Sequence, residues 1–319
     1  MEHTFSVAAA WLGLALLATF AAAKLRISIA RVEIVVGIAA AAIIGRLSGP
    51  EAIGSNLPWL TFIASSGAVL LTFLAGAELE HAVMRRKWKE VSVVGLVGFF
   101  APFFGCAAVA RFVMDWSVQS SWLAGIALST TSMAVVYAVM LETGFNATEF
   151  GKGILGSCLV NDLGTVITLG LIFSPFTFRT VVFLGVGGVA FIALPLVTPR
   201  LVDRYANRTA AFRTKFILFI LFGLGSLALW AGSEAVLPAY VAGIVLARTI
   251  GSDHAFVRRL RTLTIGFLSP FYFLRAGSLV SLPSLTAALL GAKVFPKYSG
   301  FSRLSRRSAR NETSDGITH

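Results

Sequence analysis

Long apolar blocks alternate with short polar segments along the chain as far as about residue 293. Each block is about 15 to 25 residues long, and about 20 apolar residues in a helix are enough to cross a bilayer. The pattern therefore predicts ten transmembrane helices, at about 5–23, 32–46, 58–77, 90–114, 120–140, 150–174, 178–197, 213–231, 234–248 and 262–281. An eleventh block begins near residue 283 and ends at Lys293. We expect an all-α, polytopic transmembrane helix bundle.

Two of these predicted helices, 32–46 and 234–248, are short and contain glycine, which is typical of broken or tilted helices in transporters. They also belong to an internal repeat. Residues 35–45 (Val-Val-Gly-Ile-Ala-Ala-Ala-Ala-Ile-Ile-Gly) match residues 241–251 at six of eleven positions. At nearly the same offset, Phe-Leu-Ala-Gly-Ala-Glu-Leu at 73–79 resembles Phe-Leu-Arg-Ala-Gly-Ser-Leu at 273–279. The second and third helices thus pair with the ninth and tenth.

A shift of seven helices reverses the orientation of the second copy, which predicts inverted-topology repeats. Chance similarity between apolar segments is the alternative. The expected organisation is one transmembrane domain over residues 1–293. It consists of a first repeat (about 5–174), a linker helix (about 178–197) and an incomplete second repeat (about 213–293).

Residues 294–319 are polar and basic. One interpretation is a basic cytoplasmic tail, and the other is a truncated or frameshifted product. The repeat favours truncation, because copies of the fourth, fifth and sixth helices are expected after the tenth.

The basic residues lie mainly in every second loop between the predicted helices. Only 13% of residues are charged, against about a quarter in soluble domains, and the net charge is +12. Odd-numbered loops hold 17 basic residues: Lys24, Arg26, Arg31, Arg85, Arg86, Lys87, Lys89, Lys152, Arg200, Arg204, Arg208, Arg213, Lys215, Arg248, Arg258, Arg259 and Arg261. Even-numbered loops hold only Arg46, Arg111 and Arg179. By the positive-inside rule the odd loops are cytoplasmic and the N-terminus lies outside. These charges are expected to orient the chain and contact membrane lipids, not nucleic acid.

Ionisable residues within the predicted helices are few, and such residues usually serve function. Asp162 lies near the middle of helix 150–174, preceded by Asn161. A carboxylate at this depth can hold either a proton or a cation but not both, which is the basis of exchange. The Asn161 amide can offer its oxygen to a cation or its NH₂ to a neighbour. The alternatives are a structural Asp bonded to helix backbone and an Asn that makes an interhelical contact.

Helix 120–140 contains four adjacent hydroxyl residues, Ser129, Thr130, Thr131 and Ser132. Such side chains compete with helix hydrogen bonds, so a local unwinding is expected whose carbonyls and hydroxyls can coordinate a cation. Small residues at a tight helix crossing are the alternative. Arg275 in helix 262–281 is always charged and needs a partner, either Asp162 or exposed carbonyls. We expect it to give electrostatic support.

Several other classes of site have no signal in the sequence. Cys106 and Cys158 lie within apolar blocks and are interpreted as core residues. The four histidines have no metal-ligand spacing. There is no Gly-rich phosphate loop, so transport driven by ATP from this chain is not expected. No catalytic residue and no cofactor are predicted, and the chain is not expected to be an enzyme.

Together, Asn161-Asp162, Thr131-Ser132, the Phe-Leu-x-Gly-x-Glu run at 73–78 and Phe-Leu-Arg-Ala-Gly at 273–277 resemble cation/proton antiporters of the Kef-type sodium/hydrogen exchanger superfamily. The resemblance covers about residues 5–293. It implies a homodimer, a dimerisation domain and a core domain that moves by an elevator-like shift. It also implies that Asp162 is the carrier carboxylate, that Asn161 marks an electroneutral exchanger, and that Arg275 matches a basic residue of the tenth helix.

Two features depart from that family. Met133 stands where many relatives have Pro, and a second broken helix would lie beyond Lys293. The sequence therefore predicts Na⁺ or K⁺/H⁺ antiport by alternating access at Asp162, in the inner membrane of a bacterium. A truncated, non-transporting remnant or subunit is the alternative, and a passive channel is a third hypothesis.

Overall fold

The protein is described here by a computed structural model, which covers residues 2–49, 53–79, 81–173, 178–205, 211–250 and 253–280. Within these ranges every regular element is a helix. The apolar block near residue 283 and the tail at 294–319 lie outside the described residues, as does the end of the tenth predicted helix. The expected all-α architecture is confirmed.

The helices follow the predicted spans with different bounds. They are α1 (Glu2–Leu25), α2 (Ile29–Ser48), α3 (Pro58–Ala77), α4 (His81–Ala108), α5 (Val118–Ser129), α6 (Met133–Thr143), α7 (Glu149–Phe173), α8 (Phe178–Tyr205), α9 (Phe212–Trp230), α10 (Val236–Ile250), α11 (His254–Leu263) and α12 (Ser269–Ser278). Short π-helical turns, Val109–Val113 and Thr264–Leu268, follow α4 and precede α12, and a 3₁₀ turn, Phe145–Ala147, precedes α7.

Seven stretches of the described residues are long and apolar enough to cross a membrane, with α5 and α6 forming one of them together. The α10 helix is apolar but shorter, at 15 residues. The α2 helix has 20 residues, so the expectation that it is short was wrong; Arg31, Glu33 and Arg46 interrupt its apolar sequence. The chain is thus a multi-pass integral membrane protein.

Two segments expected to be loops are helical. The basic stretch at 81–89 forms the start of α4, where Lys87 marks a kink with φ −103° and ψ 16°. The stretch at 254–263 forms α11, which begins with Asp253 accepting a hydrogen bond from the Phe256 N–H (3.0 Å). Side-chain caps of this kind satisfy amide groups that have no partner in the first helical turn.

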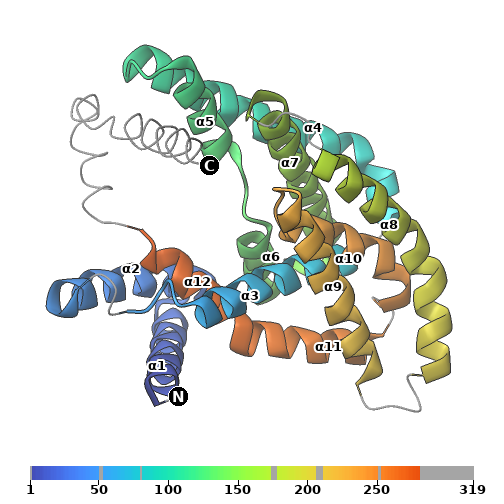
Figure 1. The fold of residues 1–319 in the computed structure, drawn as a ribbon, viewed down its shortest axis with the longest axis horizontal. Coiled ribbons are helices and arrows are strands. Elements are labelled where there is room, and N and C mark those ends of the chain that lie inside the picture. Colours follow the sequence, from blue (N-terminus) through green and yellow to red (C-terminus); the bar gives the residue numbers. More distant parts are fainter. Residues whose placement is uncertain are drawn as a thin grey trace, which may run out of the picture.

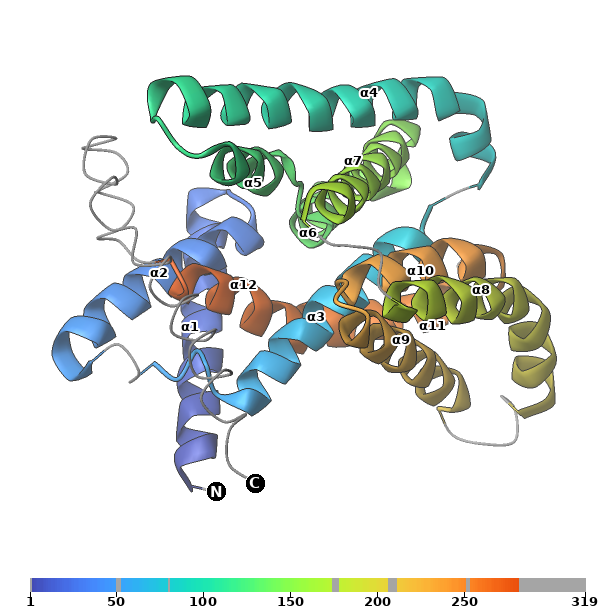
Figure 2. The ribbon, with the colours of Figure 1, turned by 45° about the horizontal axis from the view of Figure 1, so that its top comes forward.

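The helices form two layers (Figures 1 and 2). In one layer α4 crosses over α5 and α7, as Figure 2 shows. In the other, α12 packs against α1, α2 and α3, and α10 packs against α3, α8 and α9. The α6 helix packs against α7 in the first layer and against α3 and α2 in the second. It is therefore a principal connection between the layers.

Two glycine-mediated helix crossings in the second layer correspond to each other. A Cβ atom added at Gly37 would lie 2.2 Å from the Leu274 carbonyl oxygen, and one added at Gly243 would lie 2.3 Å from that of Phe73. Such crossings require small residues, because only then can the backbones approach so closely. The α2–α12 crossing is thus matched by the α10–α3 crossing.

The same correspondence fixes the register of the repeat. A Cβ at Gly277 would lie 2.0 Å from the Ile34 carbonyl oxygen, and one at Gly76 would lie 2.4 Å from that of Tyr240. Gly76 therefore corresponds to Gly277, and the sequence alignment of 73–79 with 273–279 was displaced by one residue. These crossings involve the helices that the predicted repeat pairs, α2 with α10 and α3 with α12.

Candidate functional site

The expected unwinding lies between α5 and α6. Thr130, Thr131 and Ser132 are not helical, and Thr130 has an extended conformation with φ −69° and ψ 139°. The α6 helix restarts with the Ser132 hydroxyl accepting a hydrogen bond from the Val135 N–H (3.5 Å). Among the described residues, the Thr130 and Thr131 carbonyl oxygens have no recorded hydrogen-bond partner. The run of hydroxyl residues thus coincides with an interruption that leaves carbonyl groups available.

The adjacent α7 helix presents two polar side chains to this interruption. The Nδ2 atom of Asn161 donates a hydrogen bond to the Ser129 carbonyl oxygen (3.2 Å). One turn later, the Thr165 hydroxyl lies 2.8 Å from that of Thr130. The Asn161 residue is only 4% exposed, and its buried Oδ1 atom has no hydrogen-bond partner among the described residues. A buried amide oxygen that is left unpaired is costly, so a ligand that accepts its lone pairs would stabilise the site.

Asp162 follows Asn161 on α7 and is partly buried. Successive helix residues point about 100° apart, so Asp162 flanks the face that meets the interruption. Within the described part of the chain it forms no recorded hydrogen bond or ion pair, which leaves its carboxylate available for a ligand. It also lies within electrostatic reach of Glu234, in the loop before α10.

Arg275 is not placed beside Asp162. It lies on α12, and its Nε atom donates a hydrogen bond to the Ser55 carbonyl oxygen (2.8 Å), in the segment between α2 and α3. The α12 helix packs against α1, α2 and α3, while α7 packs against α4. Arg275 and Asp162, which are both described, therefore form no ion pair. Of the two partners expected from the sequence, a carbonyl oxygen is the one observed.

Two residues near the interruption were missed by the sequence interpretation. Thr165 carried a signal, since it lies four residues after Asn161 and therefore on the same helix face. Tyr137 of α6 gave no signal in the sequence, because its hydrogen-bond partner Glu78 is 59 residues away along the chain.

The set of oxygen atoms suits a hard monovalent cation. Around the α5–α6 interruption and on the neighbouring turn of α7, the chain offers the carboxylate of Asp162, the amide oxygen of Asn161, the hydroxyl groups of Thr130, Thr131 and Ser132, and carbonyl groups. In the described residues no group of three or more His, Cys, Asp or Glu side chains forms a metal site. Groups of these kinds can bind a cation reversibly at one carboxylate, with neutral oxygens completing the shell.

Comparison with known proteins shows which family the chain belongs to. The family model for the transmembrane sodium/hydrogen exchangers matches residues 12–296. The chain belongs to this family. The match spans both layers of helices and includes the interrupted helix, Asn161 and Asp162.

Individual exchanger relatives are distant in sequence. "Probable Na(+)/H(+) antiporter 3" of Methanocaldococcus jannaschii is 24% identical over 266 residues, covering 77% of this chain and 67% of the relative. The Na(+)/H(+) antiporter of Enterococcus hirae is 25% identical over 266 residues, covering 74% and 68%. Cation/H(+) antiporter 17 of Arabidopsis thaliana is 25% identical over 274 residues, covering 76% and 33%. The chain thus spans between about a third and two thirds of the lengths of these relatives.

Proposed function

We propose that this protein exchanges a monovalent cation, Na⁺ or K⁺, for a proton across the membrane, and that Asp162 binds the two in turn. The observation that carries the proposal is the position of Asp162: a partly buried carboxylate that has no protein partner among the described residues and follows Asn161, whose buried amide bonds to the interrupted helix and has an unpaired oxygen within the described part of the chain. The relatives named above are sodium/proton and cation/proton antiporters, which supports the same activity.

The roles of the residues follow from their chemistry. A carboxylate surrounded by little water binds a proton or a cation, and occupation by one excludes the other. The Oδ1 atom of Asn161 would coordinate the cation while its Nδ2 atom stays bonded to Ser129. Thr130, Thr131 and Ser132 would supply hydroxyl and carbonyl ligands, and Arg275 would give electrostatic support away from the site. Because Asn161 is neutral, one charge exchanges for one, and we propose that transport is electroneutral.

The orientation follows from the charge asymmetry of the loops. We propose that the N-terminus lies outside, with the Arg-rich ends of α8, α9 and α11 at the cytoplasmic face. The division into repeats at about 5–174 and 213–293 joined by a linker helix, and assembly as a homodimer, are parts of the same proposal.

Ion-driven proton flux in proteoliposomes tests the activity. The full chain is reconstituted with a trapped pH-sensitive dye, a proton gradient is imposed, and Na⁺ or K⁺ is added. We expect a cation-dependent collapse of the gradient that Asp162→Asn abolishes. The matched control is Asp115→Asn, on the exposed turn between α4 and α5, which should leave the flux unchanged. Flux that persists in Asp162→Asn, or that needs no counter-ion, would refute the proposal.

A further inference from the structure

The interruption in the α5–α6 helix raises the question of what holds α6 in place. Hydrogen bonds along the backbone do not continue through Thr130, Thr131 and Ser132, so the position of α5 does not determine that of α6. The cation ligands at the interruption are nevertheless attached to the first turn of α6. Tertiary contacts of α6 must therefore set their geometry.

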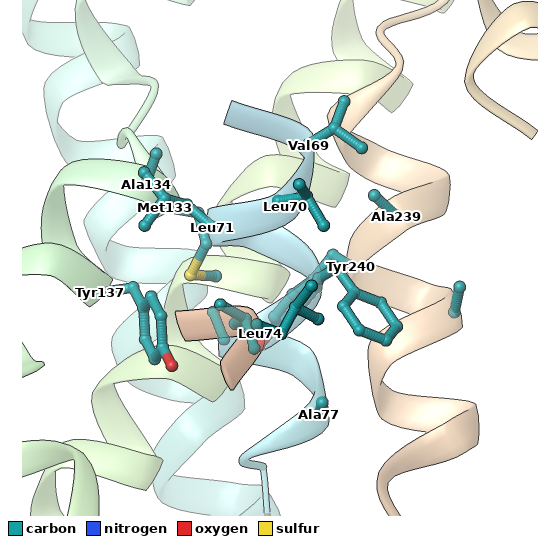
Figure 3. Close-up of a cluster of buried hydrophobic side chains, with 14 of the residues drawn as sticks. Val69, Leu70, Leu71, Leu74, Ala77, Met133, Ala134, Tyr137, Ala239 and Tyr240 are labelled. Carbon is teal, nitrogen blue, oxygen red and sulfur yellow. The ribbon is translucent and has the colours of Figure 1, made fainter. Parts of the chain in front are cut away.

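One buried polar contact on α6 is suited to this task. Tyr137 lies about 7.5 Å along the helix axis from Ser132, which is about 1.4 turns. It is 0% exposed, and its hydroxyl donates a 2.6 Å hydrogen bond to Oε1 of Glu78. Figure 3 shows the Tyr137 ring among Met133, Leu71 and Leu74, with its hydroxyl at the edge of this apolar cluster.

Glu78 is held on both of its oxygens. Its Oε1 atom also accepts a hydrogen bond from Arg261 of α11, with which it forms an ion pair. Its Oε2 atom accepts a 2.9 Å hydrogen bond from Nδ2 of Asn146, in the turn that follows α6. The Glu78 side chain is only 12% exposed, so these bonds are largely shielded from water. A carboxylate that is hydrogen-bonded at both oxygens has one orientation, and this orientation fixes the position of the Tyr137 hydroxyl.

The contact also joins the two layers of the fold. Glu78 ends α3 and Arg261 belongs to α11, whereas Tyr137 and Asn146 flank the part of α6 that leads into α7. A second polar contact supports α6 further on, since the Glu142 carboxylate accepts hydrogen bonds from the Ile29 N–H of α2 (3.0 and 3.1 Å). The Glu142 contact is exposed, while that of Tyr137 is buried and closer to the interruption.

We propose that Glu78 is a positioning residue for the cation site: through Tyr137 it fixes α6, and thereby the hydroxyl and carbonyl ligands that precede α6. This inference rests on the proposed function for its effect on transport, but not for its effect on the position of α6. Glu78 itself does not touch the cation.

The test is Tyr137→Phe, which keeps the ring and removes only the hydroxyl. The matched control is Tyr240→Phe, another buried tyrosine (2% exposed), whose hydroxyl donates to the Leu155 carbonyl oxygen at 3.1 Å. Hydrogen exchange of the α6 amides at 133–137 is measured in lipid nanodiscs, and the apparent KM for the cation is measured in proteoliposomes. We expect Tyr137→Phe to raise the exchange rate at 133–137 and the apparent KM by about tenfold each, with little change in kcat. A tenfold change corresponds to the usual contribution of a hydrogen bond to a charged group. Tyr240→Phe should change the exchange rate at 133–137 less than about twofold, because its hydroxyl bonds to α7 and not to the α6–Glu78 contact.

The outcomes separate the two proposals. Unchanged hydrogen exchange at 133–137 in Tyr137→Phe overturns the positioning role, as does an equal change in both tyrosine variants. Faster exchange in a chain that shows no flux even as wild type supports the positioning role and refutes antiport. If Tyr137→Phe does not fold, Asn146→Ala removes the hydrogen bond to Oε2 of Glu78 and should raise the exchange rate at 133–137 by about threefold. An unchanged rate there contradicts the proposal.

Discussion

Gly37 offers a direct test of the α2–α12 crossing. A methyl group at this position would lie 2.2 Å from the Leu274 carbonyl oxygen and 3.1 Å from the Ser278 nitrogen. Since non-bonded heavy atoms settle about 3.5–4.0 Å apart, Gly37→Ala must separate the helices by roughly 1 Å or more. Overpacking of this kind costs about 1–3 kcal/mol of unfolding free energy. At about 2–4 °C per kcal/mol, the value for domains of 150–250 residues, this corresponds to a fall in Tm of at most roughly 12 °C in this larger chain.

The assay is thermal unfolding of the purified chain in detergent, followed by size-exclusion fluorescence. Gly243→Ala, at the corresponding crossing of α10 and α3, should lower Tm comparably, since its Cβ would lie 2.3 Å from the Phe73 carbonyl oxygen. Gly185→Ala on α8 is the control, because no atom of the described residues lies within 4 Å of a Cβ at that position and alanine favours a helix. If Gly37→Ala were as stable as Gly185→Ala, the close crossing and the repeat register derived from it would both be wrong.

Three further predictions concern the site. Asn161→Ala should raise the apparent KM for the cation by about tenfold or more, because it removes both the buried amide oxygen and the hydrogen bond to Ser129. Proton flux measured at a series of cation concentrations gives this KM. Thr130→Val keeps the shape of the side chain and removes the hydroxyl bonded to Thr165, so the KM for the cation should rise only a few fold. Thr262→Val, at an exposed position of α11, should have no effect. Electroneutral exchange should run at the same rate with and without a potassium–valinomycin diffusion potential; a rate that follows the potential would exclude it.

The interrupted helix and its partner were predictable because their signals are local. Four adjacent hydroxyl residues compete with helix hydrogen bonds, and the Asn161-Asp162 pair is conspicuous in an apolar block. The repeat was also visible, since both copies retain the glycines that the close crossings require. Its register was displaced by one residue because short strings of Ala, Gly and Leu align almost equally well in two ways.

Other features depend on contacts that the sequence does not encode locally. Apolar patterning marks the membrane core, so it gave no indication that the polar stretches at 81–89 and 254–263 are helical. The partner of Arg275 lies 220 residues away in the segment before α3. Glu78 likewise gathers residues from three separate elements, which only the folded chain brings together.

The central claim is that Asp162 binds either a proton or a cation. The most direct measurement is proton release on cation binding, by titrating the purified chain with Na⁺ or K⁺ in weakly buffered detergent containing a pH indicator. The account predicts about one proton released per cation bound, as one carboxylate exchanges the two. It also predicts that Asp162→Asn releases none while Asp115→Asn behaves as the wild type. Cation binding without proton release, or release that survives in Asp162→Asn, would contradict the account.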